Sequence, residues 1–232
     1  MTAPAAAGFW QRYAAWSLDA ALVAVPVLLF GWPRLLAGSE RIVASFARLA
    51  DAVAAALVAA LAAPGALLGG LLQAIADPRL QAAAHMLTDA VAATLAPPLA
   101  AFVVLGLLYH VACEAAPGQA TAGKRALGLQ VVDESGGRVS VARALLRHVA
   151  GALSWLTLNL GHVLAALPPQ RRALHDRIAG AMVLQAGDAT PRLPRWARAW
   201  IAAQAVAGGA TALWLLAAMQ TVLQAAVERA LG

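Results

Sequence analysis

The sequence predicts an all-α membrane protein, a polytopic helical bundle of three to five membrane helices with a small cytoplasmic β-hairpin. Three observations lead to this class. Hydrophobic residues make up 62% of the chain and charged residues only 12%, against about 25% charged residues in soluble domains. The apolar residues are mostly Ala, Leu and Val, which suits helices that pack in lipid. The arginines gather at the ends of long apolar runs, where the positive-inside rule places them.

Charge and cysteine content exclude several other classes. The net charge is +6, and the 17 basic residues include a single lysine, Lys124. Nucleic-acid binding is not predicted, because the arginines flank apolar runs and do not alternate with aromatic residues. The lone Cys113 excludes an intrachain disulfide and a cysteine zinc cage. The spacing of His85, His148 and His162 fits no metal site, so no cofactor or metal is predicted.

Residues 1–33 contain the first predicted membrane helix, over residues 13–32, with Asp19 as its single charge. Residues 34–96 are interpreted as an insertion of two or three short helices, extracytoplasmic or lying on the membrane surface. Ser39 is a plausible helix cap, and the Pro-Gly and Asp-Pro pairs later in this stretch break helices. The alternative is a further span over residues 52–76, which would reverse the direction of the chain before it.

Residues 97–185 begin with a second predicted span, residues 97–113. The segment GQATAGK that follows fits the first seven positions of a phosphate-binding loop, but the eighth is Arg125, where a loop of that kind has Ser or Thr. A membrane helix also precedes it in place of a strand, so no nucleotide is predicted. LGLQVVDESGGRVSV is expected to form two short strands joined by a Gly-Gly turn, and AGAMVLQ, residues 179–185, could return as a strand beside the first of them.

Residues 149–167 are apolar but have arginines on both flanks, and Asn159-Leu160-Gly161 interrupts the middle. A single crossing would put one basic flank on the wrong side, which favours a re-entrant or in-plane helical pair. Residues 186–232 form a polar linker and a last span, residues 199–227. Its Gly208-Gly209 pair lies in a stripe of small residues that suits close helix contact.

Arg12 and Asp19 lie on one stripe of the first helix, roughly 10 Å apart along its axis, so that they are not expected to touch. An ionised Asp inside a span costs on the order of 3 kcal/mol, so it is expected to face protein or water. Two readings stay open: Asp19 is a proton or ion ligand, or it holds helices together by pairing with an arginine.

Other polar residues have simpler explanations. His110 and Glu114, one turn apart, are expected to form an interfacial pair that faces headgroups. Lys124 and Arg125 are expected to anchor anionic headgroups at the membrane surface. The His175-Asp176 pair is interpreted as a structural pair or helix cap beside neighbouring arginines, because no nucleophile accompanies it.

Three blocks of the sequence resemble the signature of the RDD family of bacterial membrane proteins. They are GFWQRYAAWSLDAALV, TAGKRALGLQVVDESGGRVSVARALLRH and RRALHDRIAGAMVL, in that order. The family is named for one Arg and two Asp, which the resemblance assigns to Arg12, Asp19 and Asp176. The insertion at residues 34–96 and the span after residue 198 lie outside these blocks.

The resemblance implies a multi-pass protein of the bacterial cytoplasmic (inner) membrane, in contact with lipids and either a homo-oligomer or bound to another membrane protein. The first functional hypothesis is secondary transport, with proton exchange against a small cation. Asp19 would alternate between the two ions, Arg12 would tune it, and Asp176 would gate the cytoplasmic end. The second is a non-catalytic scaffold or assembly subunit. No nucleophile and base can be combined, so the chain is not expected to be an enzyme.

Overall fold

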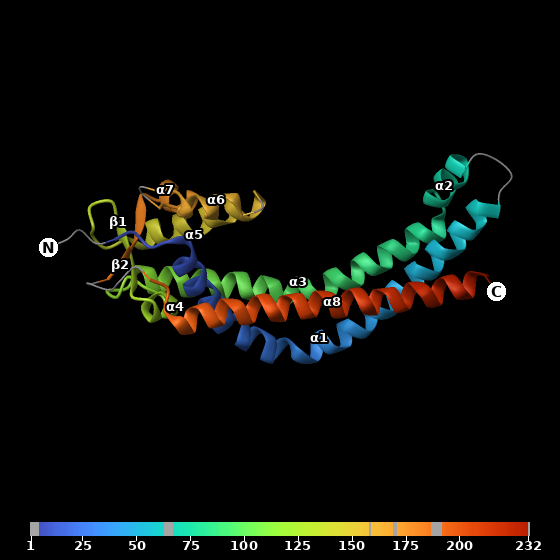
Figure 1. The fold of residues 1–232 in the computed structure, drawn as a ribbon, viewed down its shortest axis with the longest axis horizontal. Helices are drawn as coiled ribbons and strands as arrows, with labels where there is room; N and C mark the ends of the chain where they lie inside the picture. Colours follow the sequence, from blue (N-terminus) through green and yellow to red (C-terminus); the bar gives the residue numbers. More distant parts are fainter. Residues whose placement is uncertain (1–4, 63–66, 158, 169–170, 187–191, 232) are drawn as a thin grey trace. The chain divides into compact units, whose positions relative to one another are not determined.

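The computed structural model describes residues 5–62, 67–157, 159–168, 171–186 and 192–231. The chain divides into two compact units. Unit 1 comprises residues 1–27 and 101–204, and unit 2 comprises residues 28–100 and 205–232. Three long helices, α1, α3 and α8, each contribute residues to both units (Figure 1). The predicted fold class, an all-α membrane protein with a small β element, is confirmed.

The three long helices are α1, Phe9–Ala62, α3, Pro78–Ala115, and α8, Arg195–Leu231. Each is long and apolar enough to cross a membrane, and each contains one of the three predicted spans. The prediction of two or three short helices over residues 34–96 is wrong. Among the described residues of that stretch, α1 continues to Ala62, α3 already begins at Pro78, and α2, Leu67–Ile75, is the one short helix. The break predicted at the Asp-Pro pair is present, since α2 ends at Ile75 and α3 begins at Pro78, and the Pro-Gly pair, residues 64–65, lies outside the described residues.

The second span was expected to begin at Pro97, and Ser39 to cap a helix. Pro97 and Pro98 lie inside α3. A proline leaves the carbonyl four residues earlier without its helical donor, and Arg34 Nη2 supplies that donor to Ala93 O at 2.8 Å. Ser39 does not cap a helix, because its hydroxyl donates back to Leu36 O within α1, at 2.7 Å. Helix α3 therefore continues through two prolines, and α1 continues through Ser39.

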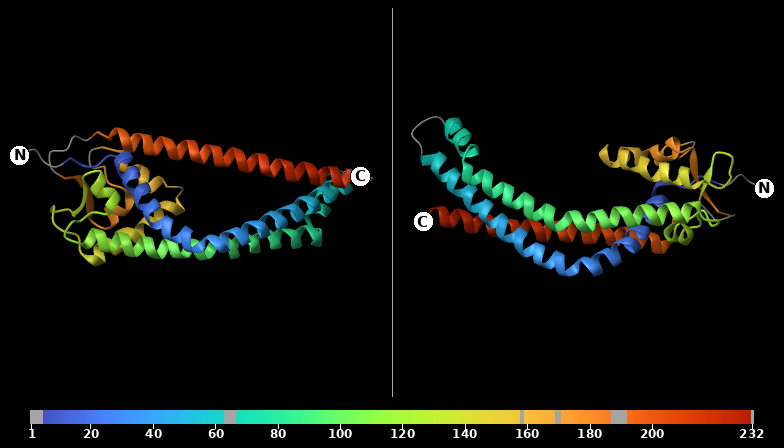
Figure 2. Two further views of the ribbon diagram at one scale, coloured as in Figure 1. Left: turned by 90° about the horizontal axis from the view of Figure 1, so that it is seen from below. Right: turned by 180° about the vertical axis from the view of Figure 1, so that it is seen from behind.

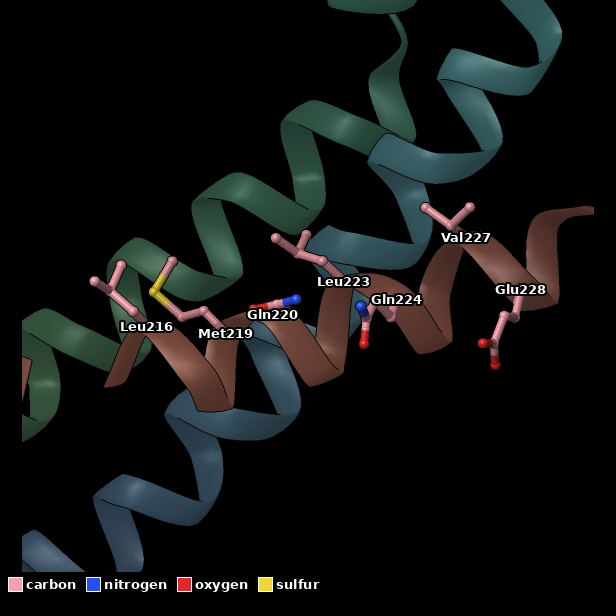
Figure 3. A pocket seen from close by; sticks show the side chains of 7 residues that line it. All are labelled: Leu216, Met219, Gln220, Leu223, Gln224, Val227 and Glu228. Atoms are coloured by element: carbon pink, nitrogen blue, oxygen red, sulfur yellow. The ribbon is translucent and has the colours of Figure 1, made fainter. Parts of the chain in front are cut away.

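Unit 2 packs through small side chains. Ala50 and Ala54 of α1 bury against Ala226 of α8, and Gly38 lies so close to Thr94 that an added Cβ would overlap the Thr94 side chain. The two views of Figure 2 agree in placing the unit 2 segments of α1 and α3 side by side. An open groove follows the last turns of α8, with side chains between Leu216 and Glu228 along it (Figure 3).

The small-residue stripe predicted on α8 makes no close contact. Among the described residues, no atom lies within 4 Å of a Cβ added at Gly208 or Gly209. The helix instead packs about five turns later, at Ala226. The close helix contact predicted at this glycine pair is therefore not made by another described helix of the chain. Small side chains permit a close approach, but they do not bring a second helix to it.

Unit 1 contains a two-stranded antiparallel sheet. Strand β1, Leu129–Asp133, pairs with β2, Ala181–Gln185, with Val131 opposite Val183. The N-terminal segment follows the other edge of β2, where Ala7 N donates to Val183 O at 2.9 Å. Strand β2 lies within the segment AGAMVLQ, so the prediction that this segment returns beside β1 is confirmed.

The predicted turn at the Gly-Gly pair is present, but the second predicted strand is reduced to a single antiparallel bridge, between Val132 and Arg138. The Asp133 carboxylate closes the turn tightly by accepting from Gly137 N at 2.8 Å. Ser140 then caps the next helix by accepting from Arg143 N at 3.2 Å, so no length remains for a second strand.

The remaining helices of unit 1 are short. They are α4, Ala122–Ala126; α5, Val141–Leu156; α6, Leu160–Val163; the 3₁₀ turn η1, Leu164–Ala166; and α7, Leu174–Ile178. The break predicted near Asn159 is present, since Asn159 has a left-handed backbone with φ of 66°. Gly161 then approaches Ser154 so closely that a Cβ would overlap its hydroxyl. The chain after α5 therefore folds back as a helical pair, and α5 lies against α7 (Figure 1).

Candidate functional site

Asp19 of α1 is fully buried and receives three hydrogen bonds within unit 1. Tyr109 Oη and Gly123 N donate to Oδ1 at 2.8 and 2.7 Å, and Thr121 Oγ1 donates to Oδ2 at 2.6 Å. The two hydroxyls are themselves acceptors for backbone N–H groups of Ala122 and Lys124, at 2.8 and 3.3 Å. The carboxylate therefore fastens the start of α4 to both α1 and α3.

Glycine at position 123 makes this arrangement possible. A Cβ there would overlap the carbonyl oxygen of Ala15 and would lie 3.0 Å from the Asp19 carboxyl carbon. Thr121 is the N-cap of α4 and is itself fully buried. The Thr-x-Gly-Lys-Arg block thus has a physical basis, in which the threonine and the glycine backbone bind Asp19.

Asp176 of α7 is the centre of a second buried cluster. Its Oδ1 accepts from Arg147 Nε at 2.8 Å, and its Oδ2 accepts from Ala173 N at 3.1 Å and from Arg12. Arg12 also donates to the carbonyls of Ala7 and Arg171, at 3.1 and 2.7 Å. Asp176 therefore caps its own helix and joins α1, α5 and α7.

Glu114, at the end of α3, continues the cluster. Arg147 Nη1 reaches both of its oxygens, at 2.6 and 2.8 Å, and Lys124 Nζ lies 2.7 Å from Oε1. Glu114 is 2% exposed and the two cations 9% each. One arginine thus bridges two carboxylates on different helices, which requires its planar, multiply donating guanidinium.

The cluster around Asp176 and Glu114 pairs every charge with an opposite one. Arg12, Lys124 and Arg147 supply three positive charges, and Asp176 and Glu114 supply two negative charges. Isolated buried charges are very costly, so these pairs are what lets five ionic groups lie close together in one small unit. Asp19 differs from them, because its three partners are neutral groups.

The electrostatic environment fixes the ionisation of the α5 and α7 groups. Burial alone would raise the pKa of Asp176, but Arg147 and Arg12 outweigh it and hold that pKa well below the usual range of a carboxyl. Burial opposes the charge of Arg147, yet Glu114 and Asp176 raise its pKa. Burial and the nearby Arg147 lower the pKa of His175 to about 3, so the imidazole is neutral.

The structure tests one of the two readings of Asp19, its pairing with an arginine. Arg12 and Asp19 form no ion pair, as predicted, and Arg12 binds Asp176. The reading in which Asp19 pairs with an arginine is wrong, because hydroxyl and backbone donors from α3 and the α4 segment already occupy its oxygens. The prediction that Asp176 belongs to a structural pair and cap is confirmed, with His175 Nε2 at 3.3 Å from Oδ1.

The headgroup assignments of Glu114 and Lys124 are wrong. Both are buried and bind each other, because the chain after α3 turns back and α4 lies beside the helix end. Arg125 is exposed and donates to Ala120 O at 3.2 Å. His110 is partly buried, with its ring 5.2 Å from that of His148. No group of three or more His, Cys, Asp or Glu suited to a metal occurs among the described residues.

Sequence reasoning missed Arg147, Tyr109, Thr121 and Gly123 as members of the site. Arg147 was treated only as part of a basic flank. Its position on α5 carried a signal, since it shares one helix face with the small residues Ala144, Ala150 and Ser154, all buried. A basic residue on a face of small residues suggests a buried partner better than it suggests a headgroup.

The comparisons with known proteins point to the same family as the three sequence blocks. The model of the RDD family matches residues 6–180. The uncharacterized protein YxaI of Bacillus subtilis (strain 168) is 28% identical over 180 residues, which cover 77% of this chain and 96% of that protein. No solved structure gives a significant match. Arg12, Asp19 and Asp176, together with the family match over three quarters of the sequence, show that the chain belongs to the RDD family.

Proposed function

We propose that this protein is a non-catalytic scaffold or assembly subunit, a multi-pass protein of the bacterial inner membrane. One observation carries the proposal. The five buried ionisable side chains of unit 1 and the partly buried Arg12 all have protein partners, and these partners come from α1, α3, α4, α5 and α7. A buried network in which every member is satisfied specifies one arrangement of the elements that it joins. Its natural role is to hold a fixed surface for another membrane protein or a second copy.

The surroundings of Asp19 favour this role over ion coupling. A coupling ion would have to displace the Thr121 and Tyr109 hydroxyls, each of which also accepts a backbone N–H of the α4 segment. Loss of these contacts would release α4 and the buried Lys124 that follows Gly123. Ion exchange at Asp19 would therefore require the core of the unit to open in every cycle.

The test compares activity and stability in the same preparations. Wild type and Asp19→Asn are reconstituted in liposomes, and dissipation of a pH gradient is followed on addition of sodium, lithium, potassium or no cation. We expect no cation-dependent response from either protein. We also expect Asp19→Asn to be less stable in detergent by about 1–3 kcal/mol, because a buried charge-assisted network loses its acceptor.

The scaffold also predicts a defined complex. After purification in mild detergent, the wild type is expected to elute with a stoichiometric partner or as a homo-oligomer. A folded wild-type monomer that exchanges cations for protons would overturn the proposal.

Proton-coupled exchange of a small cation is the second candidate. The observation in its favour is that Asp19 is the one buried carboxylate of unit 1 whose described partners include no cation, in a helix long enough to span a membrane. Protonation or a bound cation would neutralise it. Cation-dependent gradient dissipation that disappears in Asp19→Asn, while the variant stays folded and inserted, would establish this function.

A further inference from the structure

Helix α5 has its polar and apolar faces the opposite way round from a surface helix of a soluble protein. Its buried face contains a charged residue, Arg147, together with Ala144, Ala150 and Ser154. Its outer face is apolar: Val149 is 56% exposed, Leu153 46% and Leu156 82%. A helix with a polar inner face and an apolar outer face is suited to hydrocarbon on its outer side.

The length of α5 limits how it can meet a membrane. Its 16 residues extend about 24 Å at 1.5 Å per residue, less than the roughly 30 Å of a hydrocarbon core. The chain then breaks at Asn159 and returns through α6. A short helix with one broad apolar face lies along the boundary between headgroups and acyl chains, with that face about 5–10 Å deep.

A groove at the start of α5 adds cationic groups to the edge of this apolar face. Arg143, Leu146 and Ser140 line one side of it, and Arg177 and Ile178 of α7 line the other. Leu146 and Ile178 are 47% and 42% exposed, so the groove is continuous with the apolar face and has two guanidinium groups beside it.

The charge of the groove is not neutralised. Its carboxylate, Glu134, is paired with Arg172 at 2.8 Å. Arg143 has only a long contact to Asp133, 3.5 Å, and the other Asp133 oxygen is occupied by Ser135 and Gly137. Among the described residues, the Arg177 guanidinium has no hydrogen bond or ion pair. Two basic groups at the edge of a lipid-facing helix complement a phosphate in both charge and position.

We propose that this groove binds the headgroup of an anionic phospholipid of the surrounding bilayer. Arg143 and Arg177 bind the phosphate, and the acyl chains follow Leu146, Ile178 and the outer face of α5. The site is separate from the buried ion cluster, since neither arginine belongs to that cluster. The inference stands independently of whether the protein is a scaffold or an exchanger.

The first experiment measures thermal stability of the full chain in detergent during titration with phosphatidylglycerol, phosphatidylcholine or inorganic phosphate. Phosphatidylglycerol is expected to raise the Tm most. Arg143→Gln/Arg177→Gln is expected to weaken the apparent phosphatidylglycerol affinity roughly 30-fold, at about 1 kcal/mol for each basic group. The control variant, Arg79→Gln/Arg198→Gln, removes the same charge at exposed positions and is expected to keep the affinity of the wild type.

Two outcomes of this titration would overturn the proposal. Equal effects of phosphatidylglycerol in both double variants would show that the groove does not select the lipid. A Tm increase from inorganic phosphate as large as that from phosphatidylglycerol would show a free-anion site and no role for the acyl chains.

A second measurement tests the apolar half of the site. In a Cys113→Ala background, a nitroxide is attached to a cysteine at Val149 or, as a control, at Ser135 in the polar turn. In bilayers, position 149 is expected to be relaxed by oxygen more than by a water-soluble nickel chelate, and position 135 the reverse. Protection of position 149 from both reagents would mean that a protein covers α5, and it would overturn the proposal.

Discussion

Both units pack apolar side chains, but among the described residues unit 1 alone also buries charged ones. Unit 1 buries charges and holds them with ion pairs such as Arg147–Glu114 and Arg147–Asp176. Unit 2 packs alanines and glycines against each other, and its ion pair between Arg229 and Asp51 is exposed, at 56% and 49% for the two side chains. The match to the RDD family ends at residue 180, before α8 begins. The comparison teaches that Arg12 and Asp176 belong to a core held by charges, whereas the helices of unit 2, most of which lie within the family match, meet through small side chains.

The largest difference between the two units is expected when one arginine is removed from each and the loss of stability is compared. Arg147→Met leaves two buried carboxylates with one cation each, so we expect a loss of about 3–5 kcal/mol or no folded protein. Arg229→Met removes an exposed pair and should cost about 1 kcal/mol or less. Chemical or thermal unfolding in detergent measures both. Equal losses would show that unit 1 does not depend on its charges.

Glycine substitutions compare the packing of the two units. Gly123→Ala forces a Cβ into the Ala15 carbonyl, and we expect a loss of about 3 kcal/mol, because a backbone atom cannot move aside easily. Gly208→Ala places its Cβ in open space and should be neutral or stabilising by up to about 1 kcal/mol, through helix propensity. A Gly123→Ala protein with the Tm of the wild type would contradict the close approach of α4 to α1.

The pH dependence of stability should come from unit 1. The folded pKa of His175, about 3, lies below its unfolded value of about 6.5. The unfolded chain therefore takes up a proton first as the pH falls, so the contribution is complete above pH 6.5 and is lost below it. Between pH 6.5 and 5 the loss should be on the order of 2 kcal/mol.

Substituting the histidine checks the assignment. His175→Gln should reduce the slope of the Tm profile over this range without removing it, because burial also lowers the pKa values of His148 and His162. His85→Gln, at an exposed position of unit 2, should leave the slope unchanged. The stability that comes from the lowered pKa of Asp176 is fully present well above its unfolded value of about 3.9 and is lost as the pH falls below that value, outside this range. An unchanged slope in His175→Gln would mean that another group controls stability in this range.

The smallest expected effect concerns backbone strain beside the core. Arg171 has φ of 47°, a left-handed conformation that costs a residue with a Cβ about 1–2 kcal/mol. Its carbonyl nevertheless accepts from Arg12. We expect Arg171→Gly to stabilise the protein by about 0.5–1 kcal/mol and Arg171→Ala to give no such gain. Differential scanning fluorimetry of the two variants is sufficient, and a gain in both would assign the effect to the side chain.

The sequence predicted the fold class because its signals are local, whereas the resemblance to the RDD family singled out Arg12 and Asp176. Long apolar runs identify α1, α3 and α8, and a charge inside a run singles out Asp19. The partners of these residues could not be predicted in the same way. Glu114 and Lys124 stand next to a span in sequence, so headgroups were the nearest explanation, whereas Arg147, which binds Glu114, lies 33 residues further along the chain. Helix length was misread for a similar reason, since the donor that makes Pro97 acceptable, Arg34, is 59 residues from its acceptor Ala93.

Lys124 has a practical consequence for biochemical work on this protein. It is the single lysine of the chain, and its ammonium group is buried against Glu114. Amine-reactive cross-linkers therefore find no accessible lysine side chain on the folded protein, and partners should be captured with photoreactive or carboxyl-directed reagents. Conversely, slow acylation of Lys124 followed by mass spectrometry would report the rate at which the α4 segment detaches, without any engineered label.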